Sequence, residues 1–560
     1  SIDRSSDAPQ VILSWTEDDA ADFYCYRVER ATDINADSWE LISSDIDNRQ
    51  ANVFTDDGVD EDSYSTYYYR VYTYYDSGNE STYSNTGVAT LTLYIDINSM
   101  ESDEDGSRNY PFKELGRATD TYAIGGTKVK VAQGTYNESS RTGLWLVNKP
   151  GIILEGGYES TGWTRSISEY ETIIDASGLG YNVVSLPSNS MLDGFTLRGA
   201  ASNEFASGVS VYQATSVDIR NCNVTGNQRG VGIYYSSDVT IINSHVGENS
   251  NWGINAYNSS DVTVSHCFIS SNGKDGISLF GSSEESSAPI TIVNNLIYGN
   301  SWKGISAHQT DRLTVINNTI VSNDSSGISY SGITDLAISN NVIWDNSGSG
   351  IAGDGSGGTI RNNNSFDNAG GNYSNCQTDA GQDGNISADP LFIDPDKPAG
   401  DDGVFGTDDD GFALQPKSPC RDTGDSSAVP EDITEDLAGN TRIVSSAVDM
   451  GAYEIQDDGD DYEPIITADI DGGGTEDMII DYGQDVPSWQ KGLWVRYNNG
   501  SSWKRISEYS PEDVLTANID GEGTEDMIID YGQDVPSWQK GLWVRYNNGS
   551  SWKRISEYSP

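Results

Sequence analysis

Six short runs alternate apolar and polar residues along the middle of the chain: VDIRNCNV (217–224), VTIINSHV (239–246), VTVSHCFI (262–269), ITIVNNLI (290–297), LTVINNTI (313–320) and LAISNNVI (336–343). Their starts lie 22, 23, 28, 23 and 23 residues apart. A Gly-Ile pair follows about 14 residues after a run begins, as in Gly253-Ile254 and Gly276-Ile277. Short strands at this period are typical of a solenoid in which each repeat forms one coil.

The repeat lacks the leucine frame of leucine-rich repeats, so a right-handed parallel β-helix fits it best. Alternate Val, Ile and Leu side chains would face inward, and like residues would stack about 4.8 Å apart. Two columns follow: Asn221, Asn243, His266, Asn294, Asn317 and Asn340, then Cys222, Ser244, Cys267, Asn295, Asn318 and Asn341. Because stacked amides can hydrogen-bond along such a ladder, we interpret these Asn residues as structural.

Four earlier segments look like further coils: GTKVKVAQGTY (126–136), GIILEGGY (151–158), ETIIDASG (171–178) and MLDGFTLRG (191–199). They predict a solenoid of ten or eleven coils. Cys222 and Cys267 would lie two coils apart, beyond the reach of a disulfide, so both are expected to be free and buried.

The composition narrows the functional class. With 86 acidic and 32 basic side chains the formal charge is −54, which disfavours a nucleic-acid partner held by phosphate neutralisation. No apolar stretch is long enough to span a membrane as a helix. The five cysteines form no CxxC pair. The chain starts without methionine, so a leader could already have been removed. The Asn-, Ser-, Thr-, Gly- and Tyr-rich palette predicts an all-β protein.

Residues 1–93 read as a β-sandwich of short alternating strands separated by acidic and Gly turns. Trp15, the run YRVERAT (26–32) and the run TYYYRVYTYYDSGNES (66–81) resemble a fibronectin type III domain. The resemblance implies that Trp15 belongs to the core and that one of Tyr67, Tyr68 and Tyr69 forms a tyrosine corner. Such modules are mostly spacers or docking units, so no catalytic role is expected here.

Residues 94–455 would contain the β-helix and its closing segment. The entry YIDINSMESDEDGSRNYPFKELGRATD (94–120) resembles secreted pectate-lyase-like β-helix proteins. The runs ISADPLFIDP (386–395), FALQPKSPCRDTGD (412–425) and DLAGNTRIVSSAVDMGAYE (436–454) resemble the closing segment of bacterial and archaeal surface β-helix proteins. This architecture hosts lyases, hydrolases, adhesins and structural rods, so it leaves function open. A Cys376–Cys420 disulfide and two free thiols both fit the closing segment.

Residues 463–511 and 512–560 are tandem repeats that match at 44 of 49 positions. Each contains an acidic Gly-rich loop whose alternate oxygen ligands suit a hard cation, chiefly Ca²⁺. The candidate ligands are Asp469, Asp471, Gly473, Thr475 and Asp477, and Asn518, Asp520, Glu522, Thr524 and Asp526. The repeats resemble the calcium-bearing blades of integrin-like and related bacterial propellers, which implies short antiparallel strands. An acidic turn without an ion is the alternative.

A second acidic loop, AGDDGVFGTDDDG (399–411), is a weaker Ca²⁺ candidate that would fasten the closing segment. Its candidate ligands are Asp401, Asp402, Asp408, Asp409 and Asp410.

The coils offer one lyase-like cluster. Lys274, Asp275 and Lys303 fall at comparable points of adjacent coils, near Trp252 and Trp302. A base beside a carboxylate suits proton abstraction, but a plain surface ion pair explains the same residues.

A binding surface is the other candidate. Alternation places Tyr257, Phe280 and His308 outside, where an aromatic stripe could stack on sugar rings or dock a partner. Trp252 and Trp302 would extend that ligand-binding set. Isolated exposed aromatics without function are the alternative.

Together these features predict an extracellular or cell-surface structural or adhesive protein, which could assemble head to tail into a fibre. A Ca²⁺-dependent polysaccharide lyase and a non-catalytic glycan-binding protein are the alternatives, and the balance favours a protein that is not an enzyme. The expected partners are further copies of the chain or a polysaccharide, with no nucleic acid and no membrane span.

Overall fold

The computed structural model describes most of the chain up to residue 456 and eight strands beyond it. The described residues are 2–3, 10–18, 20, 22–32, 39–60, 66–75, 80–81, 84, 86–137, 144–145, 149–178, 181–201, 204–281, 289–355, 358–456, 466–468, 477–481, 493–496, 504–505, 513–517, 526–530, 542–545 and 553–554. The chain divides into two compact units, Ser1–Ile455 and Gln456–Pro560.

Two antiparallel sheets open the first unit. One contains β1 (Ile2–Asp3), β2 (Gln10–Ser14) and β5 (Val53–Asp56), and the other β4 (Glu40–Leu41), β3 (Phe23–Ala31), β6 (Thr66–Tyr75) and β7 (Gly87–Thr90). Val11, Val28 and Tyr69 are buried in their shared core, and Trp15 packs against it half-buried. The Tyr67 hydroxyl donates to the Asp60 carbonyl at 3.2 Å and accepts from its amide at 2.7 Å, a bond typical of a tyrosine corner.

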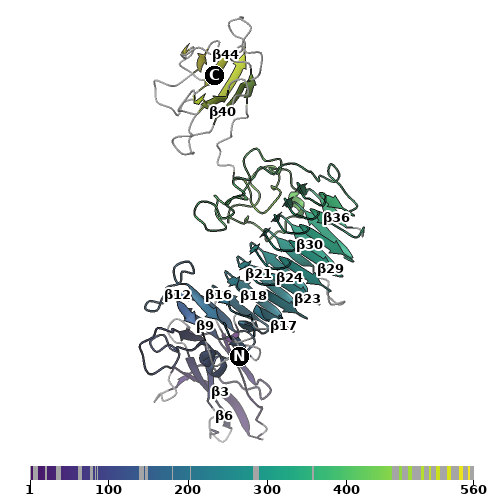
Figure 1. The fold of residues 1–560 in the computed structure, drawn as a ribbon. Helices are drawn as coiled ribbons and strands as arrows, with labels where there is room; N and C mark the ends of the chain where they lie inside the picture. The colour runs from purple at the N-terminus through teal and green to yellow at the C-terminus, as the bar shows by residue number, and fades with distance from the viewer. Residues whose placement is uncertain are drawn as a thin grey trace. The chain divides into compact units, whose positions relative to one another are not determined.

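Three parallel sheets then wind into a solenoid (Figure 1). The first sheet contains β8 (Thr92–Ile95), β9 (Lys128–Ala132), β12 (Ile153–Tyr158), β15 (Ser190–Asp193), β18 (Thr215–Arg220), β21 (Ser237–Ile242), β24 (Ser260–Ser265), β27 (Ile290–Val293), β30 (Arg312–Ile316), β33 (Asp335–Ser339) and β36 (Thr359–Arg361). The second contains β10 (Gly134–Tyr136), β13 (Thr172–Asp175), β16 (Thr196–Arg198), β19 (Asn223–Thr225), β22 (His245–Gly247), β25 (Phe268–Ser270), β28 (Leu296–Tyr298), β31 (Thr319–Val321), β34 (Val342–Trp344) and β37 (Asn364–Phe366). The third contains β11 (Leu144–Trp145), β14 (Val184–Leu186), β17 (Ser207–Tyr212), β20 (Arg229–Tyr234), β23 (Ile254–Tyr257), β26 (Ile277–Phe280), β29 (Ile305–His308), β32 (Ile328–Ser331), β35 (Ile351–Ala352) and β38 (Tyr373–Ser374).

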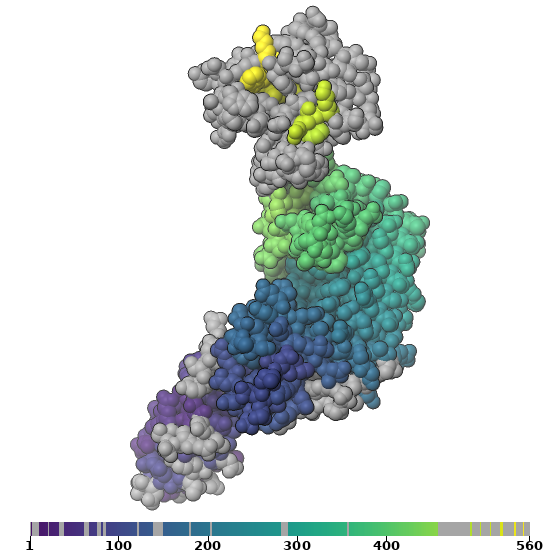
Figure 2. Space-filling model, turned by 60° about the vertical axis from the view of Figure 1, so that its left-hand side comes forward, coloured from purple at the N-terminus to yellow at the C-terminus, as the bar shows by residue number. Residues whose placement is uncertain are grey.

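Sheets of 11, 10 and 10 strands agree with the expected ten or eleven coils, and the nearly all-β composition agrees with the predicted class. The coils follow one another as a continuous colour gradient from blue to green (Figure 2). A three-residue helix, α1 (Leu115–Arg117), and a π-turn, η1 (Ala118–Tyr122), lie before β9, and a 3₁₀ turn, η2 (Ser426–Ala428), lies in the closing segment. Among the described residues, no helix has the length and apolarity to cross a membrane.

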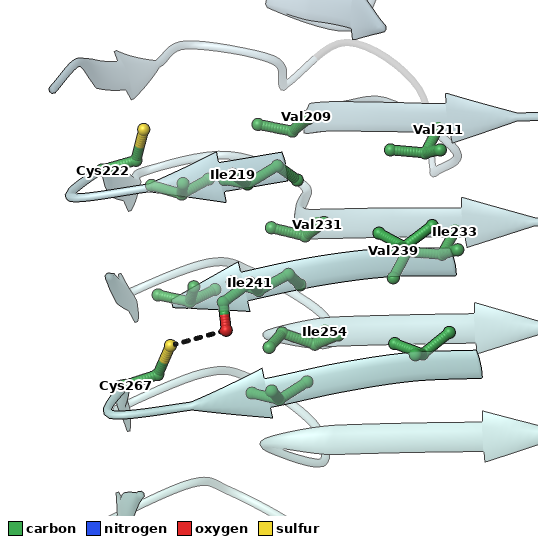
Figure 3. Packing of buried hydrophobic residues seen from close by; sticks show 14 of the residues in the cluster. Val209, Val211, Ile219, Cys222, Val231, Ile233, Val239, Ile241, Ile254 and Cys267 are labelled. Carbon is green, nitrogen blue, oxygen red and sulfur yellow. Dashed lines mark hydrogen bonds between the residues drawn. The ribbon is translucent and has the colours of Figure 1, made fainter. Parts of the chain in front are cut away.

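The solenoid core consists of stacked aliphatic residues. Val209, Val231 and Ile254 follow one another through the register of the third sheet, and all three are fully buried (Figure 3). The intervening residues face outward, which is the alternation that a strand with one buried side imposes. Apolar burial along every coil is therefore the main stabilising term of the solenoid.

The corner between the first and second sheets depends on left-handed backbone. Asn221, Asn243, His266, Asn294, Asn317 and Asn340 all have φ between +49° and +59°. Asn tolerates this region better than other residues with a side chain, which explains its repetition. The following column is an internal amide ladder, in which Asn295 Nδ2 donates to Asn318 Oδ1 at 2.9 Å and Asn318 Nδ2 donates to Asn341 Oδ1 at 3.0 Å.

The structure contains a second amide ladder that the sequence patterns did not single out. It follows the second sheet and contains Asn227, Asn249, Asn272, Asn300, Asn323, Asn346 and Asn368, all buried. Asn272 Nδ2 donates to Asn300 Oδ1 at 2.9 Å, and Asn300 Nδ2 donates to Asn323 Oδ1 at 3.0 Å. Both corners of the second sheet are thus closed by side-chain amides, which satisfy backbone carbonyls that the turns leave unpaired.

All five cysteines are free. Cys222 and Cys267 are buried as expected, and the Cys267 thiol lies 3.6 Å from the Ile241 carbonyl oxygen (Figure 3). The alternative of a Cys376–Cys420 disulfide is wrong for this structure. The two sulfurs belong to different environments: Cys376 packs against the solenoid core, whereas Cys420 is buried in the closing segment and accepts from Asn364 Nδ2 at 3.0 Å.

The closing segment, residues 386–455, packs on the outer side of the second sheet. Phe405 stacks on Phe268 with ring centroids 4.9 Å apart, and Phe412 contacts Tyr298 at 5.9 Å. The fully buried Arg442 donates to the Ala452 carbonyl and forms an ion pair with Glu454 at 3.0 Å. This segment covers aromatic side chains that the second sheet would otherwise expose to water.

The second unit contains two four-stranded antiparallel sheets. They are β39 (Ile466–Ala468), β40 (Asp477–Asp481), β41 (Leu493–Arg496) and β42 (Lys504–Arg505), then β43 (Asp513–Ala517), β44 (Asp526–Asp530), β45 (Leu542–Arg545) and β46 (Lys553–Arg554). The acidic loops at 469–476 and 518–525 lie outside the described residues. The side chains of Asp477 and Asp526, at the starts of β40 and β44, also lie outside them. The Ca²⁺ expectation for both repeats stays a prediction.

Candidate functional site

The last outward position of the third-sheet strands forms a column that we call the aromatic column. It contains Tyr212, Tyr234, Tyr257, Phe280 and His308, which the register places opposite one another in successive coils. The Tyr257 and Phe280 rings stack at 5.6 Å with an interplanar angle of 5°. Tyr235 continues the stack, with its ring 6.0 Å from Tyr212 and 5.7 Å from Tyr257. The side chains of Tyr212 and Phe280 are 57% and 43% exposed, so the column presents ring surface to solvent.

Sequence reasoning found Tyr257, Phe280 and His308 but missed the earlier members of the column. The repeated Gly-Ile pair occurs in this coil at Gly232-Ile233, but the register pairs Val231 with Ile254 and therefore makes Tyr234 the counterpart of Tyr257. Only the strand register, which depends on the turn before β20, reveals this two-residue offset.

A column of small and polar residues lies beside the aromatic column. It contains Ser210, Gly232, Asn255, Ser278, Ser306 and Ser329, again one per coil. Short side chains here leave the backbone of the sheet close to its outer surface. Asn255 and Ser278 are half-buried and carry groups able to form hydrogen bonds, whereas Ser306 is only 5% exposed and contacts Lys303 and His308.

A row of cations and aromatic rings comes just before the third-sheet strands. This cation–aromatic row contains Phe205, Arg229, Trp252, Lys274 and Trp302. The Arg229 guanidinium carbon lies 4.9 Å from the ring centroids of both Phe205 and Trp252. Lys274 Nζ lies 4.0 Å from the Trp252 centroid and 6.0 Å from that of Trp302. Trp302 is 54% exposed and Lys274 is half-buried, so these two residues offer ring surface and charge to a ligand, whereas Arg229 is only 7% exposed.

The structure brings Asp275 and Lys303 together but separates their functional groups. The Asp275 carboxylate accepts from the Lys303 backbone amide at 3.1 Å, whereas Lys303 Nζ donates to Ser329 Oγ at 3.2 Å. Asp275 is only 5% exposed, and burial raises the pKa of its carboxyl against the lowering by the Lys303 amide. Lys274 Nζ instead lies over Trp252. The lyase-like candidates therefore belong to the same surface but not to one base–carboxylate pair.

His308 ends the aromatic column in a hydrogen-bonded cluster. Its Nδ1 lies 2.6 Å from Ser331 Oγ and its Nε2 lies 3.2 Å from Ser306 Oγ. Burial, with a smaller contribution from the Lys303 charge, lowers the pKa of the imidazole below its usual 6.5. His308 is therefore mostly neutral at pH 7 and able to accept a proton.

The acidic loop at 399–411 is held by its own hydrogen bonds. Asp409 Oδ2 accepts from the Asp401 amide at 2.7 Å, Asp408 accepts from Asn440 Nδ2 at 2.7 Å, and Asp401 pairs with Lys397. Across the part of the chain that the structure describes, no three His, Cys, Asp or Glu side chains are grouped to hold a metal ion. Calcium binding by Asp401, Asp402, Asp408, Asp409 and Asp410 stays a prediction.

Comparison with known proteins supports the fold. The family model described as "Right handed beta helix region" matches residues 182–332 and 284–386. No curated protein matches the chain.

Solved structures resemble the chain only distantly. Pectate lyase Pel9A aligns with 17% identity and a TM-score of 0.43 over 65% of this chain and 96% of that one. The A-module of mannuronan C-5 epimerase AlgE6 from Azotobacter vinelandii aligns with 18% identity and a TM-score of 0.33, over 49% of this chain and 94% of that one. Tailspike protein 2 of bacteriophage CBA120 aligns with 11% identity and a TM-score of 0.31, over 50% of this chain and 45% of that one. These likenesses carry no argument by themselves, and the right-handed parallel β-helix rests on the family model and the sheet topology.

Proposed function

We propose that the chain is an extracellular protein that binds a polysaccharide along the outer face of the third sheet. The observation that carries the proposal is the aromatic column and the cation–aromatic row, which border one polar column. Exposed rings stack on the apolar faces of sugars, and the Ser and Asn side chains between them can bond to sugar hydroxyls. One binding position per coil, repeated about every 4.8 Å, suits a polymer with a comparable repeat.

Charge favours an anionic polysaccharide. The chain carries a net charge of −54, yet this face gathers the half-buried Lys274 and Lys303, with Arg229 beneath the surface at 7% exposure. A cationic patch in an acidic protein attracts an anionic ligand locally, and salt weakens that attraction.

The direct test measures binding of the full chain to polygalacturonate and to neutral dextran, at low and high salt. We expect polygalacturonate to bind more tightly, and a Trp252→Ala/Trp302→Ala variant to lose affinity. Tyr24→Ala serves as the control, because Tyr24 is 51% exposed but belongs to the N-terminal sheets. Equal binding by the tryptophan variant and the native chain would refute the proposal.

Further predictions accompany this proposal. The N-terminal sheets would act as a fibronectin-like spacer, and self-association into a fibre remains a prediction. The Ca²⁺-dependent lyase alternative predicts an unsaturated product that absorbs ultraviolet light when polygalacturonate is added, and that absorbance can be followed in the binding samples.

A further inference from the structure

A chain of hydrogen bonds crosses two coils where the aromatic column ends. Ser331 Oγ contacts His308 Nδ1, His308 Nε2 contacts Ser306 Oγ, and Lys303 Nζ contacts Ser306 and Ser329 at 3.5 and 3.2 Å. We call Ser331, His308, Ser306 and Lys303 the relay. β29 and β32 hold it rigidly, because His308 pairs with Ser331 and Ser306 pairs with Ser329 in the register.

The contacts place a hydroxyl against each imidazole nitrogen. Ser331 Oγ lies 2.6 Å from Nδ1, and Ser306 Oγ lies 3.2 Å from Nε2. In the tautomer that carries its proton on Nε2, Ser331 donates to Nδ1, while Ser306 accepts from Nε2 and from the Lys303 ammonium. This is the arrangement in which a histidine serves as the base for a serine nucleophile.

The surroundings allow a substrate to reach the pair. Ser331 and His308 are half-buried at the ends of their strands, and His308 follows Phe280 in the aromatic column. A sugar stacked on Phe280 would place its substituents near Ser331. Two carboxyl groups lie near the relay: Asp275 is only 5% exposed, and the exposed Asp354 accepts from the Gly332 amide at 2.7 Å, next to Ser331. The direct contact of a serine hydroxyl with an imidazole is the arrangement used for acyl transfer.

We propose that Ser331 and His308 hydrolyse O-acyl esters on the bound polysaccharide, with Ser331 as nucleophile and His308 as general base. The choice of a polysaccharide ester rests on the proposed function. Ser306 and Lys303 are positioning residues, because they hold the imidazole and need not touch the substrate.

The step balances with water as the only co-reactant. Ser331 Oγ attacks the ester carbonyl carbon, and its proton passes to His308 Nδ1. The bond to the sugar oxygen then breaks, and His308 returns that proton to the leaving hydroxyl. Water attacks the acyl-serine with His308 again as base, which releases the carboxylic acid and restores Ser331.

The test uses the full chain with 4-nitrophenyl acetate and a fluorophosphonate probe, read by absorbance and by mass spectrometry of the labelled peptide. We expect labelling at Ser331, and a loss of roughly 10²–10⁴-fold in turnover for Ser331→Ala and for His308→Gln. Ser168→Ala is the control, because Ser168 is an exposed serine before β13 of the second sheet and belongs to neither the binding face nor the relay. Absence of labelling, or labelling that Ser331→Ala leaves unchanged, would overturn the inference.

A second readout separates positioning from structural roles. Ser306→Ala frees His308 Nε2, so we expect its turnover to fall and its pH profile to shift, while circular dichroism stays unchanged. An unchanged pH profile of turnover would show that Ser306 does not position His308. If the chain hydrolyses the ester but does not bind polysaccharide, the proposed function is wrong while the Ser331–His308 pair stands. If the chain binds polysaccharide but does not hydrolyse the ester, this inference is wrong while the proposed function stands.

Discussion

Single residues of the third-sheet face carry the proposed binding. Tyr257 and Phe280 stack on each other, and Phe280 keeps 43% of its surface exposed. Each ring offers a flat apolar surface without a buried polar group to satisfy, so its removal changes affinity more than stability.

Replacing Phe280 with Ala is expected to weaken polysaccharide binding. An aromatic contact contributes about 0.5–1.5 kcal/mol, which corresponds to roughly a 2- to 12-fold rise in Kd. Isothermal titration of the full chain measures it, and the melting temperature should stay close to that of the native chain. A rise in Kd that comes with a large fall in melting temperature would point to misfolding instead.

Asn318 illustrates a buried residue with a purely structural role. Its Nδ2 donates to the Ile292 and Ile316 carbonyls and to Asn341, and its Oδ1 accepts from Asn295. Asn318→Ala should lower the free energy of unfolding by about 1–3 kcal/mol for each buried group left unpaired. Urea unfolding followed by fluorescence measures the loss, and a change below 0.5 kcal/mol (about the level of a surface substitution) would contradict this role.

At the scale of elements, the closing segment joins the solenoid through buried polar groups as well as aromatic rings. Asp449 accepts from the amides of Asp422 and Ile455 at 2.7 and 2.8 Å, while Arg442 donates to the Asp449 carbonyl. Asn317 reaches across from the solenoid to the same carbonyl. These bonds give the segment one defined position on the coils.

The closing segment should be more stable at mildly acidic than at neutral pH. Burial raises the pKa of Asp449 from 3.8 to about 6, so the folded state holds that proton more tightly than the unfolded chain. This contribution is fully present below pH 3.8 and is lost as the pH rises through about 6. Hydrogen exchange of the segment at pH 4.5 and pH 7 measures the change.

An Asp449→Asn variant isolates this contribution. It should exchange with a flatter pH dependence than the native chain, whereas Asp57→Asn at an exposed site should leave the dependence unchanged. Identical slopes for Asp449→Asn and the native chain would assign the pH effect to other groups.

At the scale of the whole molecule, we expect different roles for the two units. The first unit has a solenoid core, a separate core between its N-terminal sheets and a candidate binding face. The second consists of two near-identical repeats, and both copies keep an acidic loop, with Asn518 and Glu522 in place of Asp469 and Gly473.

Calcium should bind the second unit. We expect the full chain to take up Ca²⁺ in isothermal titration, and an Asp471→Ala/Asp520→Ala variant to lose that uptake, because each substitution removes a hard oxygen ligand. Asp402→Ala tests the loop at 399–411 separately. If the double variant still takes up Ca²⁺, the binding sites lie elsewhere in the chain.

Self-assembly is a further expectation from the sequence. Electron microscopy of the purified chain with and without EDTA would show filaments that shorten when Ca²⁺ is removed. Discrete particles under both conditions would refute the fibre.

Much of the fold follows from the sequence because its signal is local. Apolar alternation within a strand and the spacing between runs predicted the coils, their number and the inward residues. Left-handed Asn at the corners and the ladder through Asn295, Asn318 and Asn341 also follow, since stacking repeats one local conformation in every coil.

Only the tertiary structure decided how distant segments meet. The turn before β20 set the register that adds Tyr234 to the aromatic column, and packing of the closing segment kept Cys376 and Cys420 apart. The contacts of Lys303 and His308 with Ser329 and Ser331 also join neighbouring coils, 23 to 26 residues apart in sequence. Period and alternation determine that coils stack, whereas side-chain rotamers and turn lengths determine which groups touch, and those depend on the packed neighbours.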